Sequence, residues 1–269
     1  MSLLLFDAHN HLQEFAGRSD FDRVQAEARE AGVGRMVVNG TREEDWPVVA
    51  ELARREPDLV IPAFGLHPWH VAKRTPHWRE TLEALLREFP GAAVGEIGLD
   101  RWIPEYDWDD QVAVFLEQWR LAVALDRVPV VHCLRAFGHL EQLLLNEPRP
   151  SRGWLLHSYG GPPGMVPAFS KLGASFSFSG YFLHPRKIAD RSAAFAAVPR
   201  ERLLLETDAP DMAPPEDFRR FACPPGADGK PVNHPGNLAG VCEGLAEILG
   251  LSPGALAGLT DANARALFG

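Results

Sequence analysis

Short apolar runs rich in β-branched residues alternate with longer amphipathic segments along the chain of 269 residues. The runs have the length and composition of buried strands, and the segments between them carry apolar residues at helical spacing. The expected strands are 3–8, 34–39, 59–64, 92–97, 128–133, 153–158, 173–179 and 202–207. The expected helices are 21–31, 43–55, 78–89, 109–126, 138–147, 163–172, 185–198, 238–249 and 253–268.

This alternation predicts an α/β fold, because strands separated by helices form right-handed units that build a parallel sheet. Eight such units in about 250 residues match the size of a TIM (β/α)8 barrel. Since no linker or low-complexity segment divides the chain, we expect residues 1–269 to form a single domain. The segment 209–236, rich in proline and glycine, is expected to be a long active-site loop after the eighth strand.

Composition narrows the classes of protein to which the chain can belong. No apolar run reaches the ~20 residues of a membrane helix, and no basic region precedes the first apolar run, as it would in a signal peptide. The three cysteines are few and unpaired in spacing, which is typical of a reducing compartment. A net charge of −9 argues against a strongly basic surface but permits a local basic patch. We expect a cytoplasmic monomer without a membrane partner.

Candidate metal ligands stand at the ends of several expected strands, where TIM barrels carry their active sites. His9 and His11 end the first run, and alternate side chains of a strand face the same way, so this pair aims two imidazoles at one point. Imidazole is the commonest metal ligand in proteins. The other candidates are Glu96 on the fourth strand, His132 on the fifth, His157 on the sixth and Asp208 after the eighth.

Four imidazoles and two carboxylates form a set suited to Zn²⁺, Mn²⁺ or a similar divalent ion. Six ligands exceed the three or four that hold one catalytic zinc, whereas two ions about 3.5–4 Å apart and bridged by a carboxylate use them all. Glu96 is the expected bridge, because its strand lies between the first strand and the fifth and sixth. Each residue alone could be structural, but six coincidences at one end of one barrel favour a metal site.

Two acidic residues are candidates for orienting these ligands. Asp7 and Glu206 lie two positions before His9 and Asp208, so alternation places both in the barrel interior one layer down. Buried carboxylates need partners, and we expect these to be the N–H groups of the ligand histidines. Asp208 is the candidate general base, because one of its oxygens can accept a proton while the other holds a metal ion.

Several segments together resemble the TatD-type metal-dependent hydrolases of the amidohydrolase superfamily, over essentially the whole chain. The resemblance implies a TIM barrel with two divalent ions, and phosphodiester hydrolysis as in members described as deoxyribonucleases, including exonucleases. It assigns His9, His11, Glu96 and Asp208 to one ion, and Glu96, His132 and His157 to the other. The segments are Asp7-Ala8-His9-Asn10-His11-Leu12, Gly65-Leu66-His67-Pro68, Gly95-Glu96-Ile97-Gly98-Leu99-Asp100, His132-Cys133-Leu134-Arg135-Ala136, Leu156-His157-Ser158-Tyr159-Gly160-Gly161, Phe178-Ser179-Gly180, Glu206-Thr207-Asp208-Ala209-Pro210 and Asn263-Ala264-Arg265-Ala266-Leu267-Phe268.

The chain departs from the family pattern in loops that are expected to face the substrate. Gln13 stands where the family usually has Asp, Arg101-Trp102 where it commonly has an aromatic pair, and Val232-Asn233-His234-Pro235 where it has Arg-Asn-Glu-Pro. The candidate substrate contacts are His67, Arg135 and Asn233, of which an arginine suits phosphate through its bidentate fork. Three tryptophans in rim loops could stack a base, although a role in anchoring the loops is favoured: Trp69, Trp102 and Trp108.

The leading functional hypothesis is a divalent-metal-dependent deoxyribonuclease that acts on DNA ends, single-stranded DNA or a small phosphodiester through a metal-activated water. The alternative is a small-molecule amidohydrolase or lactonase with the same two-ion centre, which the acidic composition and the altered loops favour. A metal-binding scaffold without catalysis is the least favoured class, because all six ligands and a base are present. Ligand type alone does not separate Zn²⁺, Mn²⁺ and Mg²⁺.

Overall fold

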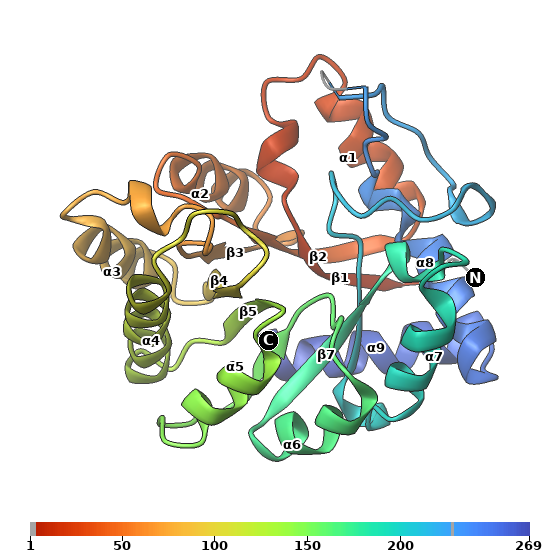
Figure 1. The fold of residues 1–269 in the computed structure, drawn as a ribbon. Helices are drawn as coiled ribbons and strands as arrows, with labels where there is room; N and C mark the ends of the chain where they lie inside the picture. Colours follow the sequence, from red (N-terminus) through yellow and green to blue (C-terminus); the bar gives the residue numbers. More distant parts are fainter. Residues whose placement is uncertain (1–3, 227–228) are drawn as a thin grey trace.

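The computed structural model describes residues 4–226 and 229–269, and its strands form one parallel sheet in sequence order (Figure 1). This is the predicted α/β barrel. The first expected strand began at residue 3, which lies outside the described residues. The eight strands are β1 (Leu5–Asn10), β2 (Val33–Asn39), β3 (Val60–Phe64), β4 (Ala93–Asp100), β5 (Pro129–Leu134), β6 (Trp154–Leu156), β7 (Ala174–Ser179) and β8 (Leu203–Glu206).

Helices surround the strands, because each strand is followed by at least one helix that packs its apolar stripe on the sheet (Figure 1). Two helices follow β8, as the hydrophobic pattern predicts. Among the described residues, none of the helices has the length and apolarity needed to cross a membrane. The helices are α1 (Phe21–Glu30), α2 (Trp46–Arg55), α3 (Trp78–Glu88), α4 (Trp108–Ala124), α5 (Phe137–Leu144), α6 (Val166–Lys171), α7 (Ile188–Ala196), α8 (Leu238–Leu249) and α9 (Pro253–Phe268).

The largest difference from the expected strands is at β4, which was predicted to end at residue 97 and continues to Asp100. Glu96 therefore lies inside the strand rather than at its end. The sequence Gly98-Leu99-Asp100 gives a weak strand signal because glycine disfavours strands. The fold nevertheless needs Gly98, since a Cβ atom at this position would collide with the backbone carbonyl oxygen of His132 on β5.

The barrel closes where the segment after β8 meets β1. The backbone N–H of Asp208 donates to the carbonyl oxygen of His9 over 3.0 Å. The backbone N–H of His11 donates to the carbonyl oxygen of Ala209 over 2.7 Å. These bonds place the ends of the first and last strands side by side. The closure thus brings Asp208 next to His9 of β1 and to His11, which follows the end of this strand.

The barrel interior is apolar below the ends of the strands. Buried side chains from seven strands form one cluster, which the last turn of α9 covers at the opposite end of the barrel. The ring of Phe268 in α9 stacks on that of Phe6 in β1 with 6.0 Å between centroids. This cluster consists of Phe6, Ala8, Val37, Ile61, Ala63, Ala93, Val128, Val130, Leu155, Leu204, Ala264, Leu267 and Phe268.

His234 anchors the long loop after β8 against α1. Its ring stacks on Phe221 at 5.0 Å between centroids, its Nδ1 accepts a hydrogen bond from the N–H of Gly236 over 2.9 Å, and its Nε2 lies 3.2 Å from Oε2 of Glu27. Burial lowers the pKa of His234 to about 4, although the charge of Glu27 opposes this shift. The folded protein therefore holds this imidazole in its neutral form near pH 6.

Replacement of Phe268 tests whether α9 stabilises the barrel through its interior. Phe268→Ala removes a buried ring that nothing else replaces, so we expect the free energy of unfolding in urea to fall by about 3 kcal/mol. Leu145→Ala is the control, because Leu145 is 53% exposed and its truncation should change that energy by less than about 0.5 kcal/mol. Equal effects of the two substitutions would contradict this role of α9.

His234 should make stability depend on pH. An unfolded histidine titrates near 6.5, so below that pH the unfolded chain binds a proton that the folded chain binds only near pH 4. The contribution of the neutral imidazole is complete above pH 6.5 and is lost as the pH falls toward 4. Between pH 7 and pH 5, the free energy of unfolding in urea should decrease in both proteins. The decrease should be smaller in His234→Gln than in the parent protein, by about 1–2 kcal/mol. If the unfolding free energies of the two proteins changed equally with pH, protonation of His234 would not destabilise the folded state.

Candidate metal centre

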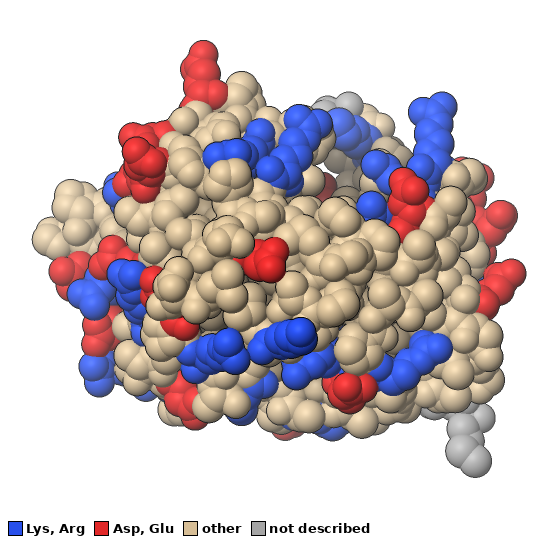
Figure 2. Space-filling model, turned by 60° about the horizontal axis from the view of Figure 1, so that its bottom comes forward, with Lys and Arg blue, Asp and Glu red and all other residues tan. Residues whose placement is uncertain are grey.

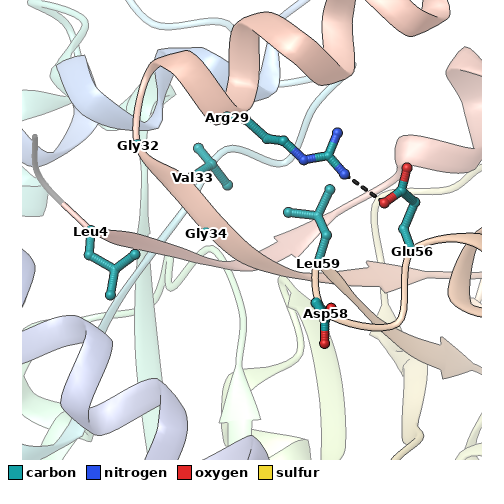
Figure 3. A pocket seen from close by; sticks show the side chains of 8 residues that line it. All are labelled: Leu4, Arg29, Gly32, Val33, Gly34, Glu56, Asp58 and Leu59. Atoms are coloured by element: carbon teal, nitrogen blue, oxygen red, sulfur yellow. Dashed lines mark hydrogen bonds and ion pairs between the residues drawn. The ribbon is translucent and has the colours of Figure 1, made fainter.

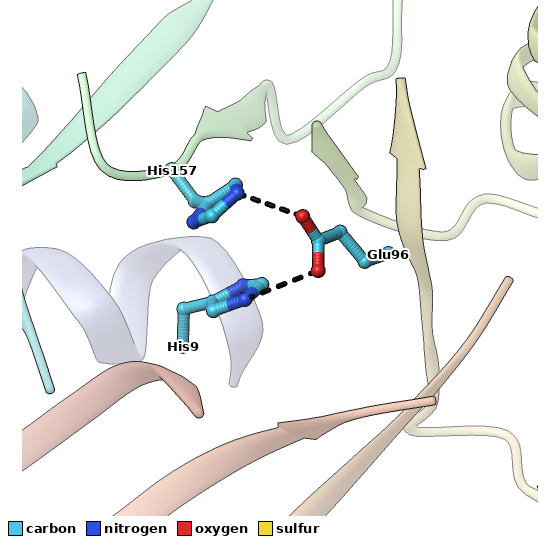
Figure 4. Close-up of side chains that lie close together, drawn as sticks. All are labelled: His9, Glu96 and His157. Carbon is cyan, nitrogen blue, oxygen red and sulfur yellow. Dashed lines mark ion pairs between the residues drawn. The ribbon is translucent and has the colours of Figure 1, made fainter. Parts of the chain in front are cut away.

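Glu96 lies at the centre of the predicted site, and its two carboxylate oxygens face different histidines, as Figure 4 shows for His9 and His157. Oε2 lies 3.5 Å from Nε2 of His9 and 3.4 Å from Nε2 of His11. Oε1 lies 3.3 Å from Nδ1 of His132 and 2.8 Å from Nε2 of His157. The carboxylate is buried, so both oxygens depend on these neighbours.

Asp208 completes the half of the centre that β1 supplies. Its Oδ1 lies 3.4 Å from Nε2 of both His9 and His11. The donor atoms of His9, Glu96 and His157 lie within 4.8 Å of one another, as do those of His9, His11 and Asp208. The structure thus brings together all six side chains that the sequence singles out as metal ligands.

Irregular strand pairing turns these ligands into the barrel. On β1, Phe6 and Ala8 already belong to the interior cluster, and the pairing with β2 shifts register between Asp7 and Asn10. On β4, Ala93 belongs to the same cluster, and the pairing with β5 shifts between Val94 and Ile97. Irregularities of this kind re-aim side chains near active sites. They allow the histidines of β1 and the glutamate of β4 to share the space above the apolar interior.

Each of three ligand histidines has its second ring nitrogen beside an oxygen. Nδ1 of His11 donates to the carbonyl oxygen of Asn39 over 2.8 Å, and Nε2 of His132 lies 3.0 Å from Oδ2 of Asp100. Nδ1 of His157 lies 3.6 Å from Oε1 of Glu206. A neutral imidazole whose one nitrogen carries the proton presents a lone pair at the other. In the neutral form that binds metal, the partners of His11 and His132 therefore direct a lone pair of each ring toward the centre.

This donor set fits divalent cations. Nε2 of His9 and Nε2 of His11 lie 3.3 Å apart, and Nδ1 of His132 and Nε2 of His157 lie 3.4 Å apart. Ring nitrogens that present lone pairs to each other at these distances repel unless a cation lies between them. Within residues 4–226 and 229–269, no lysine or arginine forms an ion pair with Glu96 or Asp208. The clustered imidazole and carboxylate groups are thus positioned to bind metal.

The surroundings keep both carboxylates ionised. Burial alone would raise the pKa of Glu96, but positive charge on the surrounding histidines, His157 foremost, holds it well below its ordinary value. Burial likewise opposes ionisation of Asp208, yet His11 and His9, when they carry a positive charge, lower its pKa. Ionised carboxylates are the form that coordinates metal.

His67 approaches the same centre but presents an N–H group to it rather than a lone pair. Its Nε2 lies 3.4 Å from Oε1 of Glu96, and its ring packs on the edge of His132 at 4.6 Å between centroids. Its Nδ1, however, accepts a hydrogen bond from the backbone N–H of Trp69 over 3.2 Å. Burial lowers its pKa to about 3, so the ring is neutral and the proton resides on Nε2. In this tautomer His67 is a hydrogen-bond donor at the centre, and its ligand atom lies within 4.8 Å of those of Glu96 and His132.

Glu206 and Asp7 are both fully buried, but they differ in what they contact. Glu206 lies beside Nδ1 of His157 and accepts a hydrogen bond from Ser177. Asp7 instead accepts hydrogen bonds from the backbone N–H of His9 and from the backbone and hydroxyl of Thr207. The expectation that Asp7 orients a ligand imidazole is wrong, because the register shift in β1 breaks the alternation on which it relied.

Asn233 also differs from its predicted role as a substrate contact. It is 1% exposed, its Nδ2 donates to the carbonyl oxygen of Thr207, and its Oδ1 accepts from His234 and Asn237. All its polar atoms are thus used within the protein, and it attaches the long loop to the end of β8. Arg135 follows β5 as an exposed side chain, with its guanidinium carbon 5.6 Å from the ring centroid of Trp102.

The sequence reasoning missed Asp100, which is buried against His132. The signal was available, because Asp100 lies four positions after Glu96 and therefore on the same face of the strand. The carbonyl oxygen of Asn39, which holds His11, carries no such signal since every residue has one.

A second cavity lies away from the centre, at the end of the barrel where β2 and β3 begin (Figure 3). It has a volume of about 490 Å³ and contains no metal-ligating histidine. Its charged residues Arg29 and Glu56 pair with each other over 2.6 Å. We therefore assign the chemistry to the opposite end of the barrel.

Comparison with known proteins agrees with this geometry. The family model described as TatD related DNase matches residues 6–269. A 3'-5' ssDNA/RNA exonuclease TatD of Erwinia tasmaniensis is 30% identical over 98% of this chain and 99% of its own length. The uncharacterized metal-dependent hydrolase YjjV of Escherichia coli is 32% identical over 77% of this chain and 79% of its own length.

Solved structures show the same likeness. The crystal structure of YjjV, a TatD homologue of Escherichia coli, superimposes with a TM-score of 0.87 at 29% identity, over 99% of this chain and 98% of that one. A hydrolase of the TatD family from Entamoeba histolytica gives a TM-score of 0.84 at 17% identity, which supports the fold alone. From the match of the family model over nearly its whole length, this chain belongs to the TatD related DNase family.

Proposed function

We propose that this protein hydrolyses phosphodiester bonds at the ends of single-stranded DNA, at a pair of divalent ions held within one barrel domain. The observation that carries the proposal is the division of Glu96, whose two oxygens face two separate groups of histidines. A bridging carboxylate with nitrogen ligands on both sides is the donor pattern of a two-ion centre. The names of the family and of the Erwinia relative support DNA as the substrate and the 3′ end as the starting point.

Divalent ions in this centre would acidify water and offset negative charge on a phosphoryl oxygen. The residues of the chain provide the remaining functions. Oδ1 of Asp208 faces His9 and His11, which leaves Oδ2 as the atom that can accept a proton from the attacking water. Nε2–H of His67 can donate a hydrogen bond to a phosphoryl oxygen seated beside Glu96.

Local positive charge supports an anionic substrate although the net charge is −9. Figure 2 shows Lys and Arg side chains along the upper and lower borders of one face, with Asp and Glu side chains among them. Near the centre, Arg135 is an exposed cation that, among the described residues, forms no ion pair with a carboxylate. Such a group can neutralise a phosphate of the bound strand.

The first test is hydrolysis of a single-stranded DNA that carries a fluorescent label at its 5′ end, with Mg²⁺ or Mn²⁺. We expect a ladder that shortens from the 3′ end and disappears with chelator, and a loss of rate of at least about a hundredfold in Asp208→Asn. Binding should weaken as salt is added, because contacts with phosphates release counterions. Absence of shortening by a protein that binds two metal equivalents would refute DNA as the substrate and leave small esters, amides and lactones to be tested.

Replacement of His67 separates a hydrogen-bond donor from a metal ligand. His67→Ala should lower the rate of DNA hydrolysis about a hundredfold, since it removes a donor aimed at the developing charge. Its metal content, measured by elemental analysis, should equal that of the parent protein. Glu96→Gln is the matched comparison, because it removes the proposed bridge and should lose metal as well as activity. Loss of a metal equivalent from His67→Ala would show that this histidine is itself a ligand.

A further inference from the structure

Two tryptophan rings are exposed at the rim of the metal centre. Trp69 is 53% exposed and Trp102 is 59% exposed, whereas Trp46, Trp119 and Trp154 are fully buried. Trp108, which begins α4, is covered by the guanidinium of Arg101 at 4.1 Å from its ring centroid. Exposed aromatic rings beside a functional site offer apolar surface that a ligand can cover.

One carboxylate positions both tryptophans next to the centre. Oδ2 of Asp100 accepts a hydrogen bond from Nε1 of Trp69 over 2.8 Å, and Oδ1 accepts one from the backbone N–H of Trp102 over 2.6 Å. The same Oδ2 lies 3.0 Å from Nε2 of the ligand His132. The ring of Trp69 also packs edge-on against that of His67, at 5.5 Å between centroids. The ring of Trp69 is thereby held beside the centre, and the backbone of Trp102 is attached to the same carboxylate.

A cation accompanies the more exposed ring. The guanidinium carbon of Arg135 lies 5.6 Å from the ring centroid of Trp102, and Arg135 follows His132 on the same strand end. An aromatic face beside an arginine offers one surface for a base and one charge for a phosphate, which are the two parts of a nucleotide. Arg135 can thus bind a backbone phosphate of a nucleic-acid strand whose base stacks on the ring of Trp102.

We propose that Trp69 and Trp102 form a subsite on which unpaired bases of the substrate strand stack, next to the phosphodiester that is cleaved. The proposal rests on the function proposed above and deepens it, because it names the part of the substrate that the rim recognises. Stacking requires a free base face, so the subsite selects single strands over paired ones and tolerates every base. Where the family commonly has an aromatic pair, this chain has Arg101-Trp102, so it keeps one ring at this place and puts a cation beside it.

The test uses a single-stranded oligonucleotide with a stable abasic residue at one of its last three 3′ positions, beside the intact strand. At the position that occupies the subsite, we expect the parent protein to prefer the intact strand about tenfold in kcat/KM. Trp102→Leu, which keeps apolar bulk without a π face, should abolish this preference and raise KM more than it lowers kcat. Trp102→Phe, which keeps a flat ring, should retain most of the preference, and Leu145→Ala should leave it unchanged.

Binding measurements keep this inference separate from the hydrolysis it builds on. Fluorescence anisotropy of the same labelled strands, recorded in chelator so that no cleavage occurs, should show the same order of affinities. Discrimination against the abasic strand without any cleavage would retain the subsite and refute the nuclease function. Equal handling of intact and abasic strands by parent and Trp102→Leu proteins, in both experiments, would overturn the subsite.

Discussion

The organisation of this molecule depends on two carboxylates that are buried without a lysine or arginine partner among the described residues. A charge of this kind is stable in the interior only if other groups or a bound cation compensate it. Glu96 and Asp208 are compensated by imidazoles alone, and imidazoles at such short separations also need a cation between them. The same constraint explains why the remaining polar groups of this layer, such as the carbonyl of Asn39, contact the far sides of the rings.

The barrel meets this constraint by separating an apolar interior from a polar rim. Side chains such as Phe6, Val37 and Leu204 fill the lower part of the barrel, and α9 covers its end. Dense packing there fixes the backbone from which the ligands project. The register shifts in β1 and β4 then direct side chains into the upper interior that regular alternation would have turned elsewhere. Rigid packing and local irregularity thus act together to place the centre.

The sequence predicted those features that follow from regular periodicity. Eight apolar runs were enough for the barrel, and the spacing of His9 and His11 was enough to bring their rings together, at 3.3 Å between Nε2 atoms. Regular alternation was misleading for Asp7, because a register shift is a property of strand pairing and cannot be read from one strand. The sequence was also misleading for Asn233, since an amide in a loop gives no indication of whether its partners are solvent or backbone. The backbone hydrogen-bond partners and the positions at which strands end could therefore be learned only from the structure.

Histidines of one centre can serve opposite purposes, and the partner of the second nitrogen decides which. An acceptor behind the ring, as Asp100 is for His132, directs a lone pair inward, whereas a donor behind it, as the N–H of Trp69 is for His67, directs a proton inward. Both partners belong to one connected group, since Trp69 also donates to Asp100. A change at the rim that displaces Trp69 would therefore alter a metal ligand and a hydrogen-bond donor together. Glu206 behind His157 has no such link to an exposed residue, because its partner Ser177 is buried in β7. Within the part of the chain that the structure describes, Asp100 on β4 thus links an exposed tryptophan to a metal-ligand histidine on β5.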